Sequence, residues 1–73
     1  MRSNKNIRNK EQEALLVEIH RTKLALEIAY SNFENSLDPD LIDSYIYEVN
    51  AVQKRYKFLL RQLKELDVEN YAV

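Results

Sequence analysis

Three aspartates and the only proline of the chain lie in the segment NSLDPDLID, residues 35–43. Carboxylates this close in sequence are candidates for metal binding or for acid and base catalysis. The same residues also fit a helix start, with Asp38 as N-cap, Pro39 at the first helical position and Asp40 where the helix dipole favours an anion. Because a capping carboxylate points at its own backbone and no base or ligand lies nearby in sequence, we interpret the segment as a helix start.

Few other groups in the sequence could carry catalysis. There is no cysteine and no glycine, and His20 is the single histidine. These absences argue against the usual nucleophilic, zinc and phosphate-loop arrangements. We interpret His20 as a partly covered surface residue, and we expect no enzyme activity, no metal, no cofactor and no small-molecule substrate.

Apolar residues recur at alternating steps of three and four in both halves of the chain, which predicts two amphipathic helices with a heptad seam. The second half carries Ile42, Tyr45, Val49, Val52, Tyr56, Leu59, Leu63 and Leu66 at these steps. The first half carries Leu16, Ile19, Lys23, Leu26, Tyr30, Phe33 and Leu37. Only Lys23 breaks the pattern, either by reaching to water while its stem packs or by fixing register or oligomer order.

The connection between these helices is so short that the second must fold back on the first. We therefore predict an all-α fold, an antiparallel, coiled-coil-like two-helix hairpin in a single domain, residues 1–73. Its predicted parts are a flexible basic arm (1–9), helices at 10–36 and 39–66, and a tail (67–73).

A chain of 73 residues is short for a core that is stable alone, and it has no cysteine for a disulfide. This favours self-association into a four-helix bundle or docking on a protein partner. The alternative is a marginal hairpin with a few apolar surface residues.

A second set of apolar residues falls opposite the seam of each helix, with Lys54 among them. The candidate partner-binding residues are Val17, Leu24, Ile28, Tyr47, Lys54 and Phe58. The first hypothesis is therefore a non-enzymatic interaction or adaptor protein that binds itself or a protein partner.

Charge is segregated along the chain, although the net charge is only −1. In the hairpin, acidic residues gather at the corner and basic residues toward the open end. The candidate nucleic-acid contacts are Arg2, Lys5, Arg8, Lys10, Arg55 and Arg61. Neighbouring glutamates dilute this basic end, and no aromatic residue lies among the N-terminal bases for stacking. A nucleic-acid accessory protein is the open, less favoured alternative.

No apolar run approaches the roughly 20 residues needed to span a bilayer, and the basic N-terminus is not followed by the apolar region of a secretory signal. We expect no membrane association and a cytoplasmic location.

The run DPDLIDSYIYEVNAVQKRYKFLLRQLK, residues 38–64, resembles the YaaL-like family of small bacterial proteins of spore-forming Firmicutes and their relatives. The resemblance is carried by DPDLID, then IY, NA, KRY and the LL pair, with NFENS upstream. It implies a small all-helical protein of the bacterial cytoplasm and brings no catalytic residues. Family genes often lie near recombination and sporulation genes, so a sporulation-linked regulator is a further alternative. Such a regulator would resemble the small helical-hairpin phosphatases of the Spo-zero-E type, but the SQELD signature of that family is missing from this sequence.

Overall fold

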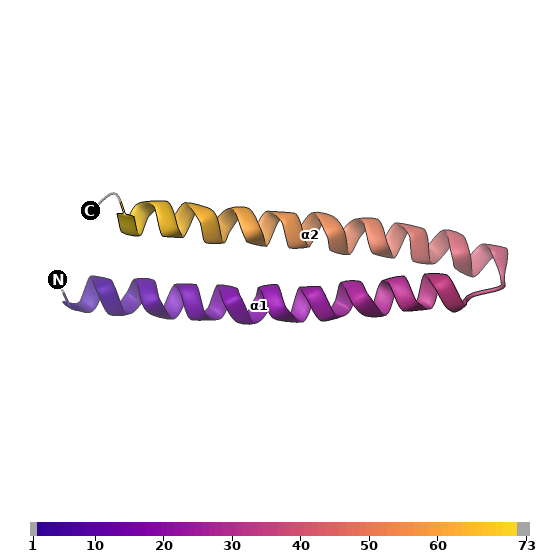
Figure 1. Ribbon diagram of the computed structural model, residues 1–73, viewed down its shortest axis with the longest axis horizontal. Coiled ribbons are helices and arrows are strands. Elements are labelled where there is room, and N and C mark those ends of the chain that lie inside the picture. The colour runs from indigo at the N-terminus through magenta and orange to yellow at the C-terminus, as the bar shows by residue number, and fades with distance from the viewer. Residues whose placement is uncertain (1, 72–73) are drawn as a thin grey trace.

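The computed structural model describes the backbone of residues 2–71 and the side chains of residues 10–66. Two helices, α1 (Arg2–Asn35) and α2 (Pro39–Tyr71), lie antiparallel along their whole length (Figure 1). The hairpin is a rod with extents of 56 × 16 × 12 Å. The predicted all-α hairpin is confirmed, and no strand occurs within residues 2–71.

The helices are longer than the sequence patterns predicted. α1 begins at Arg2 instead of Lys10, and α2 continues past Leu66 to Tyr71. Neither terminal segment contains proline or glycine, so no residue there strongly opposes a helix. The predicted flexible arm (1–9) and tail (67–73) lie outside the residues whose side chains the structure describes.

The corner between the helices is held by Asp38. Its Oδ1 accepts hydrogen bonds from the backbone N–H groups of Asp40 (2.9 Å) and Leu41 (3.4 Å). Its carbonyl oxygen accepts from the backbone N–H of Ile42 (2.9 Å), which closes the first turn of α2. Pro39 needs no partner there because it has no N–H to satisfy. The predicted N-cap is confirmed, and it fixes the point at which α2 starts.

The seam of α2 is the row that the heptad pattern predicted. All of its members are buried or half-buried: Ile42, Tyr45, Val49, Val52, Tyr56, Leu59, Leu63 and Leu66. All of these side chains are branched or aromatic, so α2 brings large apolar groups to the contact.

The seam of α1 keeps Ile19 and Leu26 of the predicted row and differs from it elsewhere. The buried or half-buried residues along it are Gln12, Leu15, Ile19, Thr22, Ala25, Leu26, Ala29 and Ser36. The predicted seam positions that are exposed, and were therefore wrong, are Leu16, Lys23, Tyr30, Phe33 and Leu37.

Compared with the prediction, α1 is rotated about its axis, so that a neighbouring row of residues faces α2, and this rotation has a physical cause. An ammonium group at Lys23 and a phenol at Tyr30 are costly to bury without partners, whereas small side chains let two helices approach closely. Thr22 is only 5% exposed, and its Oγ1 donates to the carbonyl oxygen of Glu18 at 2.7 Å, so its hydroxyl is satisfied within the helix.

The core of the hairpin is thin. Among residues 10–66 the buried apolar residues are Ala29 and Val49, and no large side chain is fully buried. A pair of helices has one contact line, so every side chain away from it faces the surface. The hairpin therefore covers only a part of the apolar surface that its two helices carry.

Candidate interaction surface

The carboxylates of the acidic corner have separate environments in the structure. Asp38 is engaged by the backbone of α2, and Asp40 and Asp43 are exposed. Among the described residues no group of three histidine, cysteine, aspartate or glutamate side chains is arranged to hold a metal ion. His20 is exposed on α1, one position from the seam.

The outer faces of the two helices carry the apolar residues singled out as partner contacts. On α1, Ile28 is 60% exposed, and Val17 and Leu24 are about half exposed. On α2, Tyr47 is 77% exposed and Phe58 is also exposed. Lys54 is exposed as well. All six candidate residues therefore lie on the surface, and Phe58 also lines a groove between the two helices. The residues of α1 and α2 lie on different sides of the rod, so a single flat partner would not contact all of them.

A further apolar surface was missed by the sequence analysis. We call it the flanking stripe, and it consists of Leu16, Lys23, Tyr30 and Leu37 on α1 with Ile46, Gln53 and Leu60 on α2. Within each helix these residues are seven positions apart, so they form one line beside the seam. The exposed fraction of Leu16, Tyr30, Ile46 and Leu60 is between 40% and 46%.

One hydrogen bond shows that the two lines of the flanking stripe share a face of the hairpin. The side-chain amide of Gln53 donates from Nε2 to the hydroxyl oxygen of Tyr30 across the two helices. Since each line follows its helix at one angular position, the remaining members of the stripe lie on the same side as these two residues. The stripe is therefore a continuous surface over both helices.

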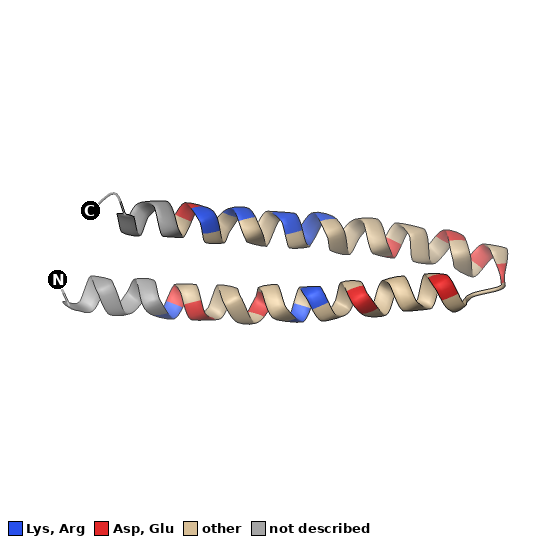
Figure 2. Ribbon diagram, in the orientation of Figure 1, with Lys and Arg blue, Asp and Glu red and all other residues tan. Residues whose placement is uncertain are grey.

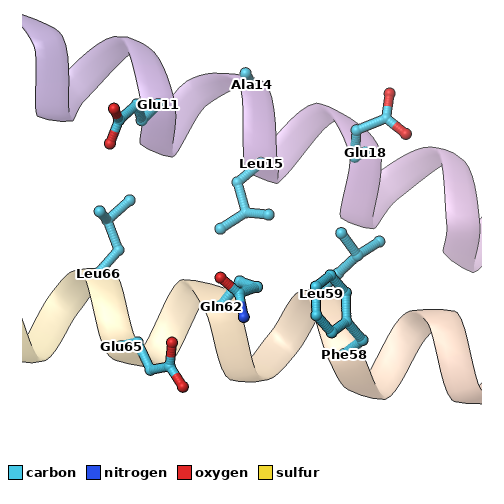
Figure 3. Close-up of a pocket in the computed structure, with 9 residues that line it drawn as sticks. All are labelled: Glu11, Ala14, Leu15, Glu18, Phe58, Leu59, Gln62, Glu65 and Leu66. Carbon is cyan, nitrogen blue, oxygen red and sulfur yellow. The ribbon is translucent and has the colours of Figure 1, made fainter.

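A groove opens between the helices near the open end, with a volume of about 480 Å³. Its lining residues are Glu11, Ala14, Leu15, Glu18, Phe58, Leu59, Gln62, Glu65 and Leu66. Figure 3 shows Leu15 and Leu59 directed into the space between the helices, whereas the carboxylate of Glu18 is turned away from α2. The groove is open to the surface and mainly apolar, with four polar residues in its lining.

Charge divides α2 into two halves. Asp40, Asp43 and Glu48 lie toward the corner, and the basic residues lie toward the open end (Figure 2). These exposed bases are Lys54, Arg55, Lys57, Arg61 and Lys64.

Of the predicted nucleic-acid contacts, Lys10, Arg55 and Arg61 are exposed, whereas the side chains of Arg2, Lys5 and Arg8 lie outside the described residues. On the facing part of α1 the exposed charges are of both signs, and Arg21 pairs with Glu18 at 3.2 Å. The open end therefore carries charges of both signs.

The flanking stripe could have been found in the sequence. Leu16, Tyr30 and Leu37 were assigned to the seam because their steps of three and four fitted it, and Thr22 and Ala29 were passed over because they are small or polar. The signal was the spacing of two heptads between Ile46 and Leu60 on the second helix, which matches that between Leu16 and Tyr30 on the first.

Comparison with known proteins places the chain in one family. No curated protein matches it significantly. No solved structure does so either. Within residues 2–71, neither helix has a stretch that is apolar and long enough to cross a bilayer. Residues 1–70 match the family described as "Protein of unknown function (DUF2508)". This match spans nearly the whole chain and is compatible with the YaaL-like resemblance of residues 38–64, so the chain belongs to this family of small proteins.

Proposed function

We propose that the protein is a non-enzymatic helical interaction protein of the bacterial cytoplasm, which binds itself or a protein partner through its exposed apolar faces. One observation carries the proposal: large apolar side chains are exposed on several sides of the hairpin, whereas within residues 10–66 its buried apolar residues are Ala29 and Val49 alone. Contiguous apolar surface of this kind marks interaction sites, because a soluble protein gains stability when it is covered.

The hairpin also lacks a second layer. Stable domains pack at least two layers of secondary structure around a shared core, and chains of this length need additional packing or a staple. The described residues include no cysteine and no metal cluster. Association with another helical surface supplies the missing layer.

The test compares charge substitutions on apolar and on polar surface positions. The apolar variant combines Ile28→Glu with Phe58→Glu, and the control combines Ser31→Glu with Asn50→Glu, which adds the same charge at exposed polar positions. We expect the apolar variant to lose self-association, measured by sedimentation at micromolar concentration, or to lose a protein retained by the immobilised parent from a lysate of its own host. Equal mass and equal retention for the parent and both variants would contradict the proposal.

The second candidate is a nucleic-acid accessory protein, favoured by the five exposed bases on the open-end half of α2. Phosphate contacts release counterions, so such binding must weaken steeply with salt. Filter binding of a duplex between about 50 and 200 mM salt measures this, with Arg55→Gln plus Arg61→Gln as the variant. Retention that is absent, or independent of salt, excludes this candidate.

A further inference from the structure

We infer that the groove near the open end is a docking site for one helix of a protein partner. This helix lays a row of apolar side chains on the floor of the groove, with an acidic residue at its N-terminal end and basic residues at its C-terminal end. The inference rests on the proposed function, because it names the surface and the kind of partner that this function would use.

The floor of the groove is apolar surface that the seam leaves partly uncovered. Leu15, Leu59 and Leu66 are half-buried, and Phe58 is 48% exposed. Figure 3 shows Leu15 and Leu59 directed into the space between the helices. On the α1 side the groove is lined by Ala14, whose side chain is a single methyl group and covers little of this floor. Apolar side chains of a partner placed here would remove the floor from water.

The length of the groove fits two turns of a helix. Its lining runs from Glu11 to Glu18 on α1 and from Phe58 to Leu66 on α2. These stretches are about 11 and about 12 Å long. A helix that docks in an apolar groove inserts residues at i, i+3 or i+4 and i+7, which also span about 11 Å. The groove is open to the surface, so it suits such a row better than a small molecule, which is mostly enclosed when it binds.

Three charges stand at the two ends of the groove. Glu11 and Glu65 line it on the side of the open end. Arg55 is exposed and lies one heptad before Gln62, a lining residue, so it continues the same line of α2 toward the corner. None of the three has an ion-pair partner within residues 10–66. Arg55 and Glu65 are ten positions apart, a rise of about 15 Å.

Other charges near the groove do not change this order. Glu18 also lines the groove, but it pairs with Arg21 at 3.2 Å, and its carboxylate is turned away from α2 (Figure 3). Lys10 and Arg61 each lie one heptad from an outer-face residue of the same helix. The lining residues, all within 10–66, include no lysine or arginine. The groove therefore has an acidic end, an apolar floor and a basic end.

This order of charges sets the direction of the docked helix. Basic residues of the partner lie beside Glu11 and Glu65, and an acidic residue lies beside Arg55, so each end meets the opposite charge. A helix is itself stabilised by acidic residues in its first turn and basic residues in its last. The docked helix therefore runs with its N-terminus toward the corner, parallel to α2 and antiparallel to α1.

The first experiment compares two labelled peptides of about three turns, each held helical by a side-chain crosslink. In the first peptide a glutamate precedes a row of leucines at i, i+4 and i+7, and two lysines follow it. The second has the same composition with the lysines before the row and the glutamate after it. Fluorescence anisotropy measures their binding to the parent. We expect the first peptide to bind at least about fivefold more tightly, and the difference to shrink as salt is added.

The second experiment fills the groove. Ala14→Leu places a larger side chain in the lining, and the matched control Ala51→Leu places it at an exposed alanine of α2 outside the lining. We expect Ala14→Leu to weaken binding of the first peptide at least about tenfold, and Ala51→Leu to change it less than about twofold. Both positions are exposed, and circular dichroism checks that the two variants keep their helices.

The third experiment removes the acidic end. Glu11→Gln combined with Glu65→Gln neutralises both carboxylates, and the control, Glu27→Gln combined with Asp43→Asn, removes as many exposed carboxylates outside the lining. We expect the preference for the first peptide to fall below about twofold in the groove variant and to stay unchanged in the control.

Three outcomes would overturn the inference. The first is that neither peptide binds at up to about 1 mM protein, and the second is that both bind equally well. The third is a parent that is a dimer in sedimentation and is dissociated by Ala14→Leu but not by Ala51→Leu, because the occupant of the groove would then be a second copy. If the peptides fail but the Ile28→Glu and Phe58→Glu variant still loses self-association or a host protein, the groove is not the site and the proposed function stands.

Discussion

The two helices of the hairpin contribute different kinds of side chain to their common seam. α2 presents branched and aromatic residues such as Val49 and Tyr56, whereas α1 presents the small Thr22 and Ala29 at the most buried part of its row. Small residues on one helix allow close approach to large ones on the other. The consequence is that α1 leaves much of its large apolar surface outside, at positions such as Ile28. We conclude that α2 contributes mainly large side chains to the seam, whereas α1 contributes small ones at its most buried positions.

The first prediction, with the largest expected effect, makes the same substitution once in the seam of α2 and once on the outer face of α1. Val49→Asp buries a carboxylate at a position that is 8% exposed, and Val17→Asp places one at a position that is 50% exposed. We expect Val49→Asp to lower the free energy of unfolding by about 3 kcal/mol or more and to abolish the hairpin, because a buried charge without a partner is strongly unfavourable. Val17→Asp should cost less than about 1 kcal/mol. Urea denaturation at one fixed protein concentration measures both, and similar losses at the two sites would contradict the assigned seam.

The second prediction tests whether α1 needs small residues at the contact. Ala29 is fully buried and Ala51 is exposed. Ala29→Leu should destabilise the hairpin by about 1–3 kcal/mol through overpacking, whereas Ala51→Leu should leave stability nearly unchanged. Thermal unfolding followed by circular dichroism compares them. An unchanged or higher midpoint for Ala29→Leu would show that the helices are not closely packed at this level.

The third prediction concerns the corner, where Asp38 caps the start of α2. Asp38→Ala removes the acceptor for two backbone N–H groups and should cost about 1 kcal/mol. Asp43→Ala removes an exposed carboxylate from the same helix and serves as control, with an effect below about 0.5 kcal/mol. The difference in denaturation midpoint is the measurement. Equal effects would mean that the carboxylate at residue 38 acts only through its charge.

The smallest effect concerns two hydroxyl groups on the α1 side of the seam. Ser36 Oγ is buried without a hydrogen-bond partner among the described residues, whereas Thr22 Oγ1 donates to a carbonyl oxygen. Ser36→Ala should stabilise the hairpin by up to about 1 kcal/mol, because it removes an unsatisfied polar group. Thr22→Val keeps the shape of the side chain and should change stability by less than Ser36→Ala. A loss of stability in Ser36→Ala would show that its hydroxyl has a partner in solution.

The parts of the fold that could be predicted are those in which residues act on their neighbours along the chain. Asp38, Pro39 and Asp40 act on neighbouring backbone groups, so their role could be predicted without knowledge of the tertiary structure. The seam of α2 was equally readable, because its apolar row runs without interruption from Ile42 to Leu66.

The candidate surface was less predictable for a physical reason. On α1 two rows of residues could form the seam, and both contain Ile19 and Leu26. At the other positions one row has Leu16 and Tyr30, and the other has Leu15 and Ala29. The hydrophobic effect depends on apolar area and favours the larger side chains in either row. Two further terms arise only when α1 packs on α2. Small side chains let the helices approach closely, and burying Lys23 and the Tyr30 hydroxyl would cost free energy, so the row with smaller residues is selected. The outer positions Val17, Leu24 and Ile28 were identified correctly as exposed because both rows leave them on the far side.

The amino-acid sequence by itself determined two helices, the residue at which the second begins and the antiparallel return, because capping and heptad spacing act locally along the chain. The tertiary structure alone decided which face of α1 meets α2, because the two possible faces differ mainly in how closely the helices approach and in which polar groups they bury. That choice also created the flanking stripe, since the large apolar residues excluded from the seam remain together on one side of the rod.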